Sequence, residues 1–270
     1  MTAPLTEEND KMTVVSFGGG VNSTAMLIGM VERGETCDLV LFADTGAEKP
    51  HTYAHVLEFS EYLVAHGMPP ITTVSNDLPS RYGGLEAYAL HHKTLPSIAF
   101  GFKTCSRVFK IDPQEMFLKE HPLAKTVWQS GDKILKLVGY DADEPHRAAK
   151  APPVNSKQDY KYRYPLIEWN WGREECVEAI ARAGVTQPGK SACFFCPSSK
   201  KKEIYELRRV YPDLAKRAVA MEQGAELITV KGLGRSFAWG DLYAADDAQD
   251  KLFPESPIEI DCGCYDGGTE

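Results

Sequence analysis

Short apolar runs alternate with longer amphipathic stretches along the first part of the chain. A helix-forming stretch follows the first of these runs, and another begins near Pro50. This strand–helix–strand order predicts an α/β fold with a mostly parallel twisted sheet, right-handed crossovers and flanking helices. The runs that predict buried strands, rich in β-branched and aromatic residues, are 13–17, 38–43, 71–74 and 134–140.

Later segments carry weaker patterns. Residues 75–104 contain prolines and glycines and predict a long excursion, with one short helix at 85–92. Residues 150–162 are polar and basic and predict a mobile loop that closes over a substrate. Further helices are expected at 172–184, where Gly184 ends the helix, and at 200–210 and 212–223.

Composition sets the scale of the molecule. The 270 residues are 43% hydrophobic, enough for one large α/β domain at 12–184 and a cysteine-bearing helical region at 185–270 packed on it. A net charge of −8 argues against nonspecific coating of nucleic acid. No apolar run approaches the roughly 18 residues of a membrane span, and no secretory leader pattern is present, so we expect a cytoplasmic protein without membrane contact.

Three consecutive glycines separate the first predicted strand from its helix. Glycine lets the backbone adopt positive φ and approach an anion closely. The free N–H groups and the positive end of the helix dipole then face that anion, and hydroxyl or amide side chains add donors. The candidate anion-binding residues of this loop are Gly18, Gly19, Gly20, Asn22, Ser23 and Thr24.

Neither common glycine fingerprint fits this loop. No lysine follows the glycines, as a Walker A loop requires, and their spacing differs from the dinucleotide-binding pattern. A tight turn without any ligand is the alternative interpretation. Asp44 ends the second predicted strand and therefore lies at the same sheet edge, as a ligand-facing carboxylate or as a helix cap.

Basic residues follow the long excursion. Arg107 and Lys110 stand three residues apart, so one helix face can carry both. Arg suits bidentate phosphate binding and Lys a point contact, although two solvated charges are the plainer alternative. A denser group occupies residues 200–217, with seven basic and three acidic side chains. It predicts either a solvated helix face or a docking surface for a nucleic-acid acceptor.

The chain has seven cysteines, and those of a Cys-x-x-Cys pair carry the strongest chemical signal. Two thiolates at this spacing hold one metal ion, two corners of an iron–sulfur cluster, or form a redox dithiol. Spacing alone leaves zinc, iron–sulfur, redox chemistry and plain packing open. The predicted metal ligands are Cys105, Cys193, Cys196 and Cys264; Cys37 and Cys176 are predicted to pack in the core.

The sequence FGGGVNST resembles the PP-loop of the ATP pyrophosphatase and phosphoadenosine phosphosulfate reductase superfamily. That loop usually reads Ser-Gly-Gly-x-Asp-Ser-Ser/Thr, and here Gly18 stands for the first Ser and Asn22 for the Asp. The reductase branch commonly has Ser-Phe-Gly, present here as Ser16, Phe17 and Gly18. The resemblance implies an adenine nucleotide alpha-hydrolase-like fold and binding of the nucleotide's phosphates.

Further elements extend the resemblance in chain order. Asp-Thr-Gly followed by Pro-x-Thr-Tyr borders the adenosine in that family, which implicates Asp44, Thr45 and Gly46. The Cys-x-x-x-(Tyr/Phe)-Lys-Ile-x-Pro element, beginning near Cys105, implies that Arg107 and Lys110 contact phosphate or sulfate.

The matching elements after the fourth predicted strand are looser. Gly139 and Arg147 fit the family pattern, with Arg147 as a second anion clamp, whereas Asp141 stands where Arg is usual. Trp169 lies in a close match to Pro-Ile/Leu-x-Asp/Glu-Trp and is predicted to be core rather than base-stacking. Cys262 resembles the C-terminal nucleophile of the sulfonucleotide reductases.

The resemblance implies three alternative functions. The first is an enzyme that uses ATP and Mg²⁺ to adenylate an acceptor such as a nucleic-acid base and then transfers sulfur to it, with Ser23, Arg107 and the loop amides stabilising the α-phosphate. The branch of the superfamily that thiolates nucleobases often carries a four-iron cluster on three cysteines, and this resemblance favours an iron–sulfur site here. The second is a phosphoadenosine phosphosulfate reductase that releases sulfite. The third is a nucleotide-binding regulator without turnover. A sulfur or electron donor protein is the expected further partner.

Overall fold

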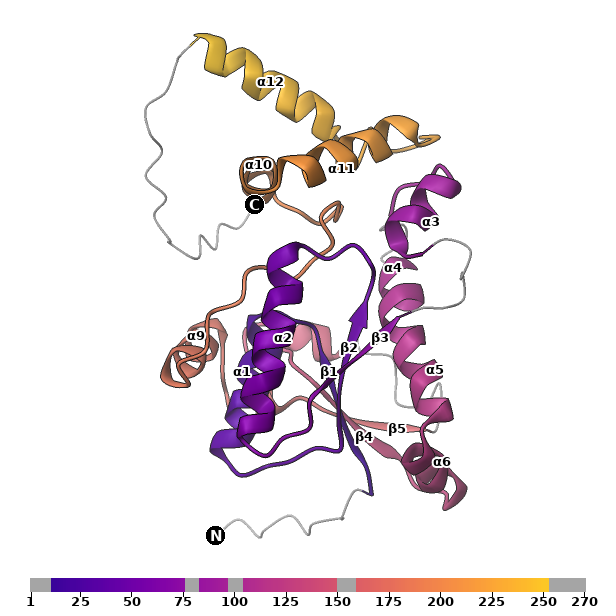
Figure 1. The fold of residues 1–270 in the computed structure, drawn as a ribbon, viewed down its shortest axis with the longest axis vertical. Coiled ribbons are helices and arrows are strands. Elements are labelled where there is room, and N and C mark those ends of the chain that lie inside the picture. The colour runs from indigo at the N-terminus through magenta and orange to yellow at the C-terminus, as the bar shows by residue number, and fades with distance from the viewer. Residues whose placement is uncertain (1–10, 76–82, 97–103, 150–158, 253–270) are drawn as a thin grey trace.

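The computed structural model describes residues 11–75, 83–96, 104–149 and 159–252. Its centre is a five-stranded sheet in the order β3-β2-β1-β4-β5, with every neighbouring pair parallel (Figure 1). The predicted α/β fold with a mostly parallel sheet is therefore confirmed. The strands are β1 (Thr13–Phe17), β2 (Leu39–Asp44), β3 (Ile71–Ser75), β4 (Ile134–Val138) and β5 (Tyr160–Arg163).

The edge strand β5 corrects the predicted loop at residues 150–162. Tyr160 pairs with Ile134 of β4, and the register continues to Arg163, so the last part of that segment is strand; residues 150–158 lie outside the described part of the chain. The sequence Tyr-Lys-Tyr-Arg alternates aromatic and charged side chains, a pattern of an edge strand. Its charges concealed the strand among the polar residues before it.

Helices cover both faces of the sheet (Figure 1). Since successive strand residues point to opposite faces, Val15 and Phe42 pack under one helical layer, and Val14 and Leu41 under the other. Both faces of the central strands are buried, which explains their continuous apolar runs. The first layer is α1 (Val21–Glu32), α2 (Pro50–Ala65) and α9 (Arg173–Arg182); the second is α5 (Asp112–Glu120) and α6 (Pro122–Gln129).

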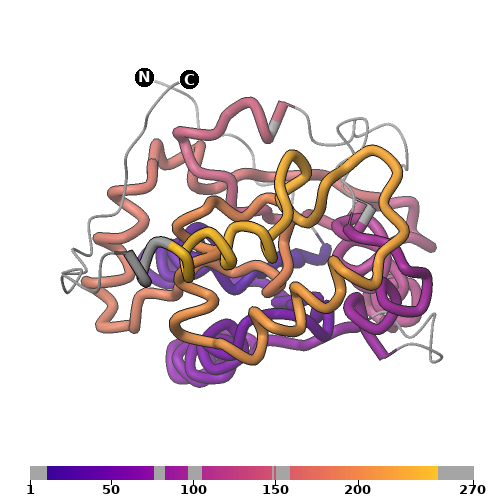
Figure 2. Tube along the Cα trace, turned by 90° about the horizontal axis from the view of Figure 1, so that it is seen from above, coloured from indigo at the N-terminus to yellow at the C-terminus, as the bar shows by residue number. Residues whose placement is uncertain are grey.

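A third helical group lies beyond the carboxyl ends of the strands (Figures 1 and 2). It has its own apolar cluster, in which Phe194, Phe195 and Trp239 pack with Leu85 and Phe109 from the preceding region. The predicted helices at 200–210 and 212–223 are confirmed, and the third was not predicted. The group consists of α10 (Lys201–Val210), α11 (Pro212–Gly224) and α12 (Trp239–Leu252).

The remaining elements are short. They are α3 (Leu85–His91), α4 (Thr104–Ser106), the π-helical turn η2 (Arg107–Ile111), α7 (Pro145–Ala149) and α8 (Pro165–Glu168). Cys176 is fully buried in α9 and Cys37 packs against the same core, as predicted. In the described part of the chain, no helix is long and apolar enough to cross a membrane.

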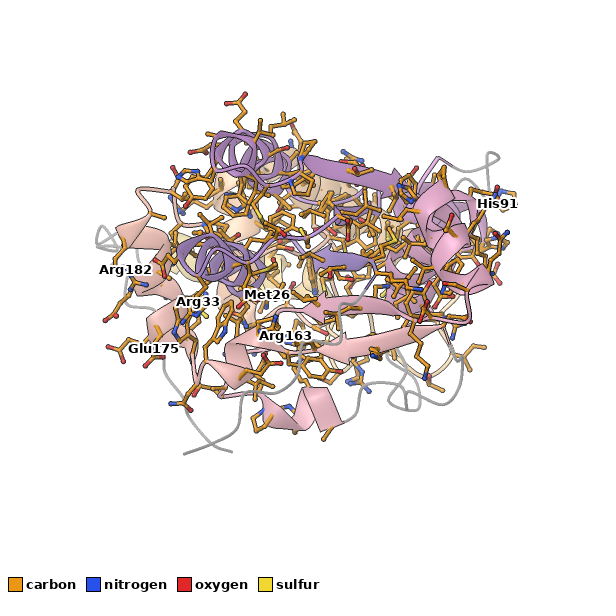
Figure 3. All side chains as sticks on the ribbon, turned by 90° about the horizontal axis from the view of Figure 1, so that it is seen from below. Met26, Arg33, His91, Arg163, Glu175 and Arg182 are labelled. Atoms are coloured by element: carbon orange, nitrogen blue, oxygen red, sulfur yellow. The ribbon has the colours of Figure 1, made fainter. Side chains whose placement is uncertain are left out.

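A close approach fixes α1 against the segment before α9. Trp169 and Trp171 pack over Gly29, and the Arg33 guanidinium lies 4.1 Å from the Trp169 ring centroid. Arg33 and Arg182 are found on the same side of the molecule, where α1 meets α9 (Figure 3). Trp169 therefore packs against the protein core, as predicted.

We expect Gly29→Ala to destabilise the protein by about 1–3 kcal/mol, because an added Cβ meets Trp169 at 2.5 Å and forces it to move. Gly224→Ala is the matched control, since a Cβ there meets nothing within 4 Å. Chemical denaturation of the two variants measures the difference. Equal stabilities would show that the tryptophans do not constrain α1.

Candidate nucleotide and thiol site

The glycine loop connects β1 to α1 and leaves main-chain donors exposed. Gly19 adopts a left-handed conformation (φ 70°), and Gly20 precedes the helix without a side-chain cap. Ser23 Oγ accepts from Gly18 N (3.2 Å) and donates to Gly20 O (3.1 Å). Within the described ranges, no residue accepts a hydrogen bond from the main-chain N–H groups of Gly19, Gly20, Val21, Asn22 or Ser23.

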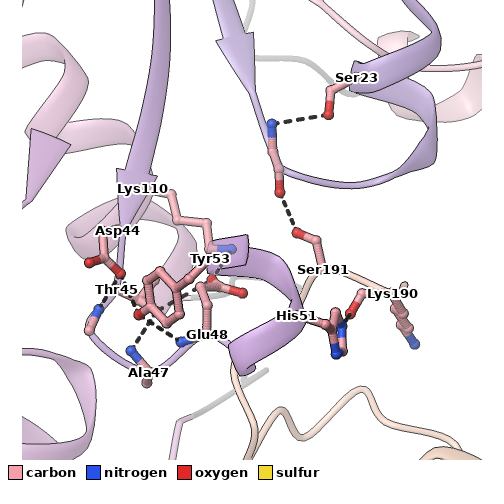
Figure 4. A network of polar contacts seen from close by, with 12 residues as sticks. Ser23, Asp44, Thr45, Ala47, Glu48, His51, Tyr53, Lys110, Lys190 and Ser191 are labelled. Carbon is pink, nitrogen blue, oxygen red and sulfur yellow. Dashed lines mark hydrogen bonds and ion pairs between the residues drawn. The ribbon is translucent and has the colours of Figure 1, made fainter. Parts of the chain in front are cut away.

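These donors lie at the N-terminus of α1 and form the positive end of its dipole. This is the arrangement that binds anions at helix N-termini. The loop is held from the other side by Ser191, whose hydroxyl donates to the Gly18 carbonyl (Figure 4). The side chains that touch the loop therefore bind the N–H and carbonyl of Gly18 and the carbonyl of Gly20. They leave the N–H groups from Gly19 to Ser23 open to a ligand.

Asn22 is engaged at both ends of its amide. Its Nδ2 donates to Asp141 Oδ2 (2.7 Å), and its Oδ1 accepts from Arg173 Nη1 (3.2 Å). Asp141 is buried at the end of β4, and burial raises the pKa of its carboxyl. The Asn22 amide thus links the start of α1 to the segment after β4 and to α9.

The end of β4 touches the first turn of α1. A Cβ on Gly139 would lie 3.1 Å from Ser23 N, so a larger residue here would push the first turn of α1 away by a few tenths of an ångström. Thr24, predicted to bind phosphate, is instead fully buried, with its hydroxyl 2.9 Å from His55 Nε2. Burial lowers the pKa of His55, which favours the neutral ring.

The side chains of two further residues that were predicted to bind the nucleotide instead contact the protein interior. The hydroxyl of Ser16 donates to Gln114 Oε1 (2.8 Å) on the α5 side of the sheet. The ring of Phe17 is buried and stacks on Phe59, with centroids 5.5 Å apart. These side chains support β1 rather than the loop opening.

The segment after β2 forms a second loop at the same edge. Asp44 Oδ1 accepts from Gly46 N and from the Tyr53 hydroxyl, both at 2.8 Å. Gly46 has φ 69° and packs closely on the Gly83–Gly84 turn. Lys49 occupies the cap position of α2, so Asp44 orders its own loop and does not cap the helix.

Glu48 is the buried centre of this second loop, although no sequence motif marked it. Its Oε1 accepts from Lys110 Nζ (2.9 Å) and from the Thr45 hydroxyl (3.3 Å), and its Oε2 has no partner among the described residues (Figure 4). Burial alone lowers the pKa of Lys110, but the Glu48 carboxylate outweighs it and the pKa is raised. A lone Glu in a polar stretch carried no signal of this role.

The two predicted anion-binding arginines have local acidic partners. Arg107 Nε donates to Asp112 Oδ1 (2.8 Å), and Arg147 Nη1 donates to Glu144 Oε2 (2.6 Å). Both arginines are solvent-exposed, and such pairs are weak. Arg107 and Lys110 contact different carboxylates, and their role as anion contacts stays a prediction.

The Cys-x-x-Cys pair lies beside this second loop. Cys193 is buried and hydrogen-bonded to Cys196, and this bond together with burial raises the pKa of Cys193. Cys105 belongs to the same apolar cluster. Two adjacent thiols suit a thiolate-bound metal or cluster, but within the described ranges no three His, Cys, Asp or Glu side chains are grouped to hold a metal ion. Cys262 and Cys264 lie outside the described residues.

The segment that carries the thiol pair is docked on both loops. Phe194 N donates to Ala47 O (2.9 Å), and Cys193 forms an antiparallel bridge with Glu48. Ser191, two residues earlier, contacts the glycine loop. The structure therefore brings together the glycine loop, the Asp44 loop, Lys110 and the cysteine pair, of which the sequence placed only the first two at one sheet edge.

The predicted basic surface at residues 200–217 is partly neutralised. Arg208 pairs with Asp246 and Asp247, and Arg217 pairs with Glu86. Lys216 also has an acidic neighbour, at 3.4 Å. The cations of this stretch without an ion pair to any described residue are Lys200, Lys201, Lys202 and Arg209.

Comparison with known proteins identifies the protein family to which this fold and its glycine loop belong. The model of the phosphoadenosine phosphosulfate reductase domain matches residues 12–184. The chain therefore belongs to the phosphoadenosine phosphosulfate reductase family, as the sequence motifs indicated.

The other comparisons are more distant. Among solved structures, the U34-tRNA thiolase NcsA from Methanococcus maripaludis, solved with its 4Fe–4S cluster, is similar at 12% identity and a TM-score of 0.44. The match covers 97% of this chain and 80% of that one. No curated protein sequence matches the chain.

We expect Lys110→Met to destabilise the protein by about 1–3 kcal/mol, because it leaves the buried Glu48 carboxylate unpaired. The double variant Glu48→Gln, Lys110→Met removes that charge and should regain much of the loss. Lys216→Met, which breaks an exposed pair, is the control and should change stability by less than about 0.5 kcal/mol. Urea titration provides the measurement; a Lys110→Met variant as stable as the control would contradict the pairing.

Proposed function

We propose that the protein is an adenine-nucleotide enzyme of sulfur metabolism, which adenylates an acceptor with ATP and then transfers sulfur to it. The acceptor we favour is a nucleic-acid base. The observation that carries this proposal is the row of unpaired N–H groups from Gly19 to Ser23, at the carboxyl edge of a parallel sheet. Membership of the phosphoadenosine phosphosulfate reductase family supports the link to sulfur chemistry.

The proposed reaction has two displacements. An acceptor carbonyl oxygen attacks the α-phosphorus of ATP, the bond to the bridging oxygen breaks, and pyrophosphate and one proton leave. A hydrosulfide equivalent from a sulfur donor then attacks the adenylated carbon, and AMP departs with the acceptor's former oxygen. The loop N–H groups hold the phosphoryl oxygens and stabilise charge as it develops. Lys110 and Arg107 are the cations that we assign to the phosphates.

The cysteine pair fits a metal or iron–sulfur group at two positions. Cys193 and Cys196 are adjacent, Cys105 shares their apolar cluster, and Cys264 is a further candidate ligand. Such a group, once bound, supplies a site that coordinates and delivers sulfide. The Lys110 ammonium lowers the pKa of Cys193 but does not overcome the hydrogen bond to Cys196 and burial, so this thiol stays protonated until a bound metal displaces the proton.

A sulfonucleotide reductase is the second candidate, favoured by the identity of the matching family model. In that reaction the Cys262 thiolate attacks the sulfate sulfur of phosphoadenosine phosphosulfate, and the sulfur–oxygen bond to the nucleotide breaks. A dithiol donor then attacks the S-sulfocysteine, releasing sulfite and leaving a disulfide on the donor.

For the acceptor we propose a docking surface at the unpaired cations of residues 200–217. These lie on the helical group at the same end of the molecule as the carboxyl edge of the sheet (Figure 1). A phosphate backbone on that surface would place a nucleic-acid acceptor near the nucleotide.

The first test of the function is nucleotide turnover. We expect the protein to bind ATP and to release pyrophosphate when acceptor RNA and sulfide are present. Gly19→Ala should weaken ATP binding about tenfold or more, because a Cβ at φ 70° is strained and lies 3.1 Å from Thr52 Cγ2. Gly67→Ala is the control, with φ 76° and open space around it.

The products separate the candidate functions. Thioredoxin-dependent sulfite release from phosphoadenosine phosphosulfate, lost in Cys262→Ser, would replace the first proposal with the second. Tight ATP binding with neither product would indicate a regulator without turnover. Failure of the wild-type protein to bind either nucleotide would overturn both catalytic proposals.

The metal proposal is tested by anaerobic purification. We expect bound iron and acid-labile sulfide in the wild-type protein, and loss of both in the Cys193→Ser, Cys196→Ser double variant. Cys37→Ser is the control, because Cys37 packs against the sheet core away from the pair. Zinc without sulfide would indicate a zinc site, and a colourless, metal-free wild-type protein would contradict both.

A further inference from the structure

We propose that Ser191 is a positioning residue of the glycine loop: it fixes the Gly18–Gly19 peptide so that the Gly19 N–H faces the anion site. This inference rests on the proposed function, since it concerns the same nucleotide site. Ser191 lies outside the segment that matches the family model, which ends at residue 184. It therefore adds to the site a residue that the family match does not include.

The contact itself is direct. Ser191 Oγ donates a hydrogen bond to the Gly18 carbonyl (Figure 4). The serine side chain is also close to the loop, because a Cβ built on Gly20 would lie 3.5 Å from Ser191 Cβ, an ordinary van der Waals distance.

Peptide planarity converts this contact into an orientation. In a trans peptide the carbonyl and the following N–H point in opposite directions. With the Gly18 carbonyl turned toward Ser191, the Gly19 N–H must point away from Ser191, to the side left open for an anion. The preceding peptide is fixed as well, because Gly18 N donates to Ser23 Oγ. Glycine at φ 70° otherwise has the freedom to rotate this donor away.

Ser191 is itself held in place by its neighbours. The carbonyl of Lys190 lies 3.4 Å from His51 Nε2, and the Lys190 ammonium contacts Glu203 at 2.7 Å. On the other side, Phe194 N is bonded to Ala47 O. The segment is thus anchored to α2, α10 and the Asp44 loop, which allows one hydroxyl to restrain a flexible glycine loop.

The same segment continues into the thiol pair two residues later. Ser191 and the thiol pair therefore belong to one short segment that is docked on both loops.

The test compares ATP affinity in three variants of the full chain. Ser191→Ala should bind ATP about three- to tenfold more weakly, the range expected for one lost orienting hydrogen bond. Ser191→Thr keeps the hydroxyl and should bind within about twofold of wild type. Ser198→Ala is the matched control, because Ser198 is exposed on the same segment and is not part of the loop contact.

A second readout separates this inference from the function on which it rests. In protein labelled with ¹⁵N-glycine, Ser191→Ala should shift the Gly19 amide resonance and speed its hydrogen exchange, while the melting temperature stays within a few degrees of wild type. If the wild-type protein binds no ATP, the proposed function fails and this amide measurement alone decides the inference. Unchanged Gly19 signals in Ser191→Ala would overturn it, as would unchanged affinity in an ATP-binding protein.

Discussion

The exposed main-chain donors at the start of α1 are the constraint around which this edge of the molecule is built. Unpaired N–H groups are costly when they lose water without gaining a partner, so the loop must keep them accessible. Side chains therefore contact other atoms: Ser23 engages Gly18 N and Gly20 O, and Ser191 engages the Gly18 carbonyl. Gly139 lets β4 approach without covering the donors. The result is a loop fixed in shape and open to an anion.

The cysteine-bearing region completes this edge rather than forming a separate body. Its apolar cluster includes Leu85 and Phe109 from the preceding region. Its Cys193 also forms an isolated antiparallel β-bridge with Glu48. The buried Glu48 carboxylate then holds the Lys110 ammonium beside the thiols. The glycine loop and the thiol pair, which are far apart in the sequence, thereby meet at one edge of the sheet.

The sequence predicted most of the sheet because buried parallel strands are largely apolar runs, as β1, β2 and β4 are, and because β3 is rich in β-branched residues. It missed β5, where charged residues alternate with tyrosines, and α12, whose pattern is weak. It also named the glycine loop and the cysteine pair, which local motifs reveal. It did not name Glu48 or Ser191, because their partners are 62 and 173 residues away in the chain. A single buried acid or serine has no local pattern, and only the folded structure brings it to the site.

Two of the departures from the family's usual motifs at this edge form one coupled pair. The motif usually has Asp at the position of Asn22 and Arg at the position of Asp141. Here Asn22 Nδ2 donates to Asp141 Oδ2 at 2.7 Å, which requires an amide on one side and a carboxylate on the other. An Asp at both positions would bring a second carboxylate into contact with the buried Asp141, at an electrostatic cost. Arg173 adds a third member to this series of hydrogen bonds by donating to Asn22 Oδ1. The altered loop thus keeps a polar link between α1 and the segment after β4, while the N–H groups from Gly19 to Ser23 have no protein partner among the described residues.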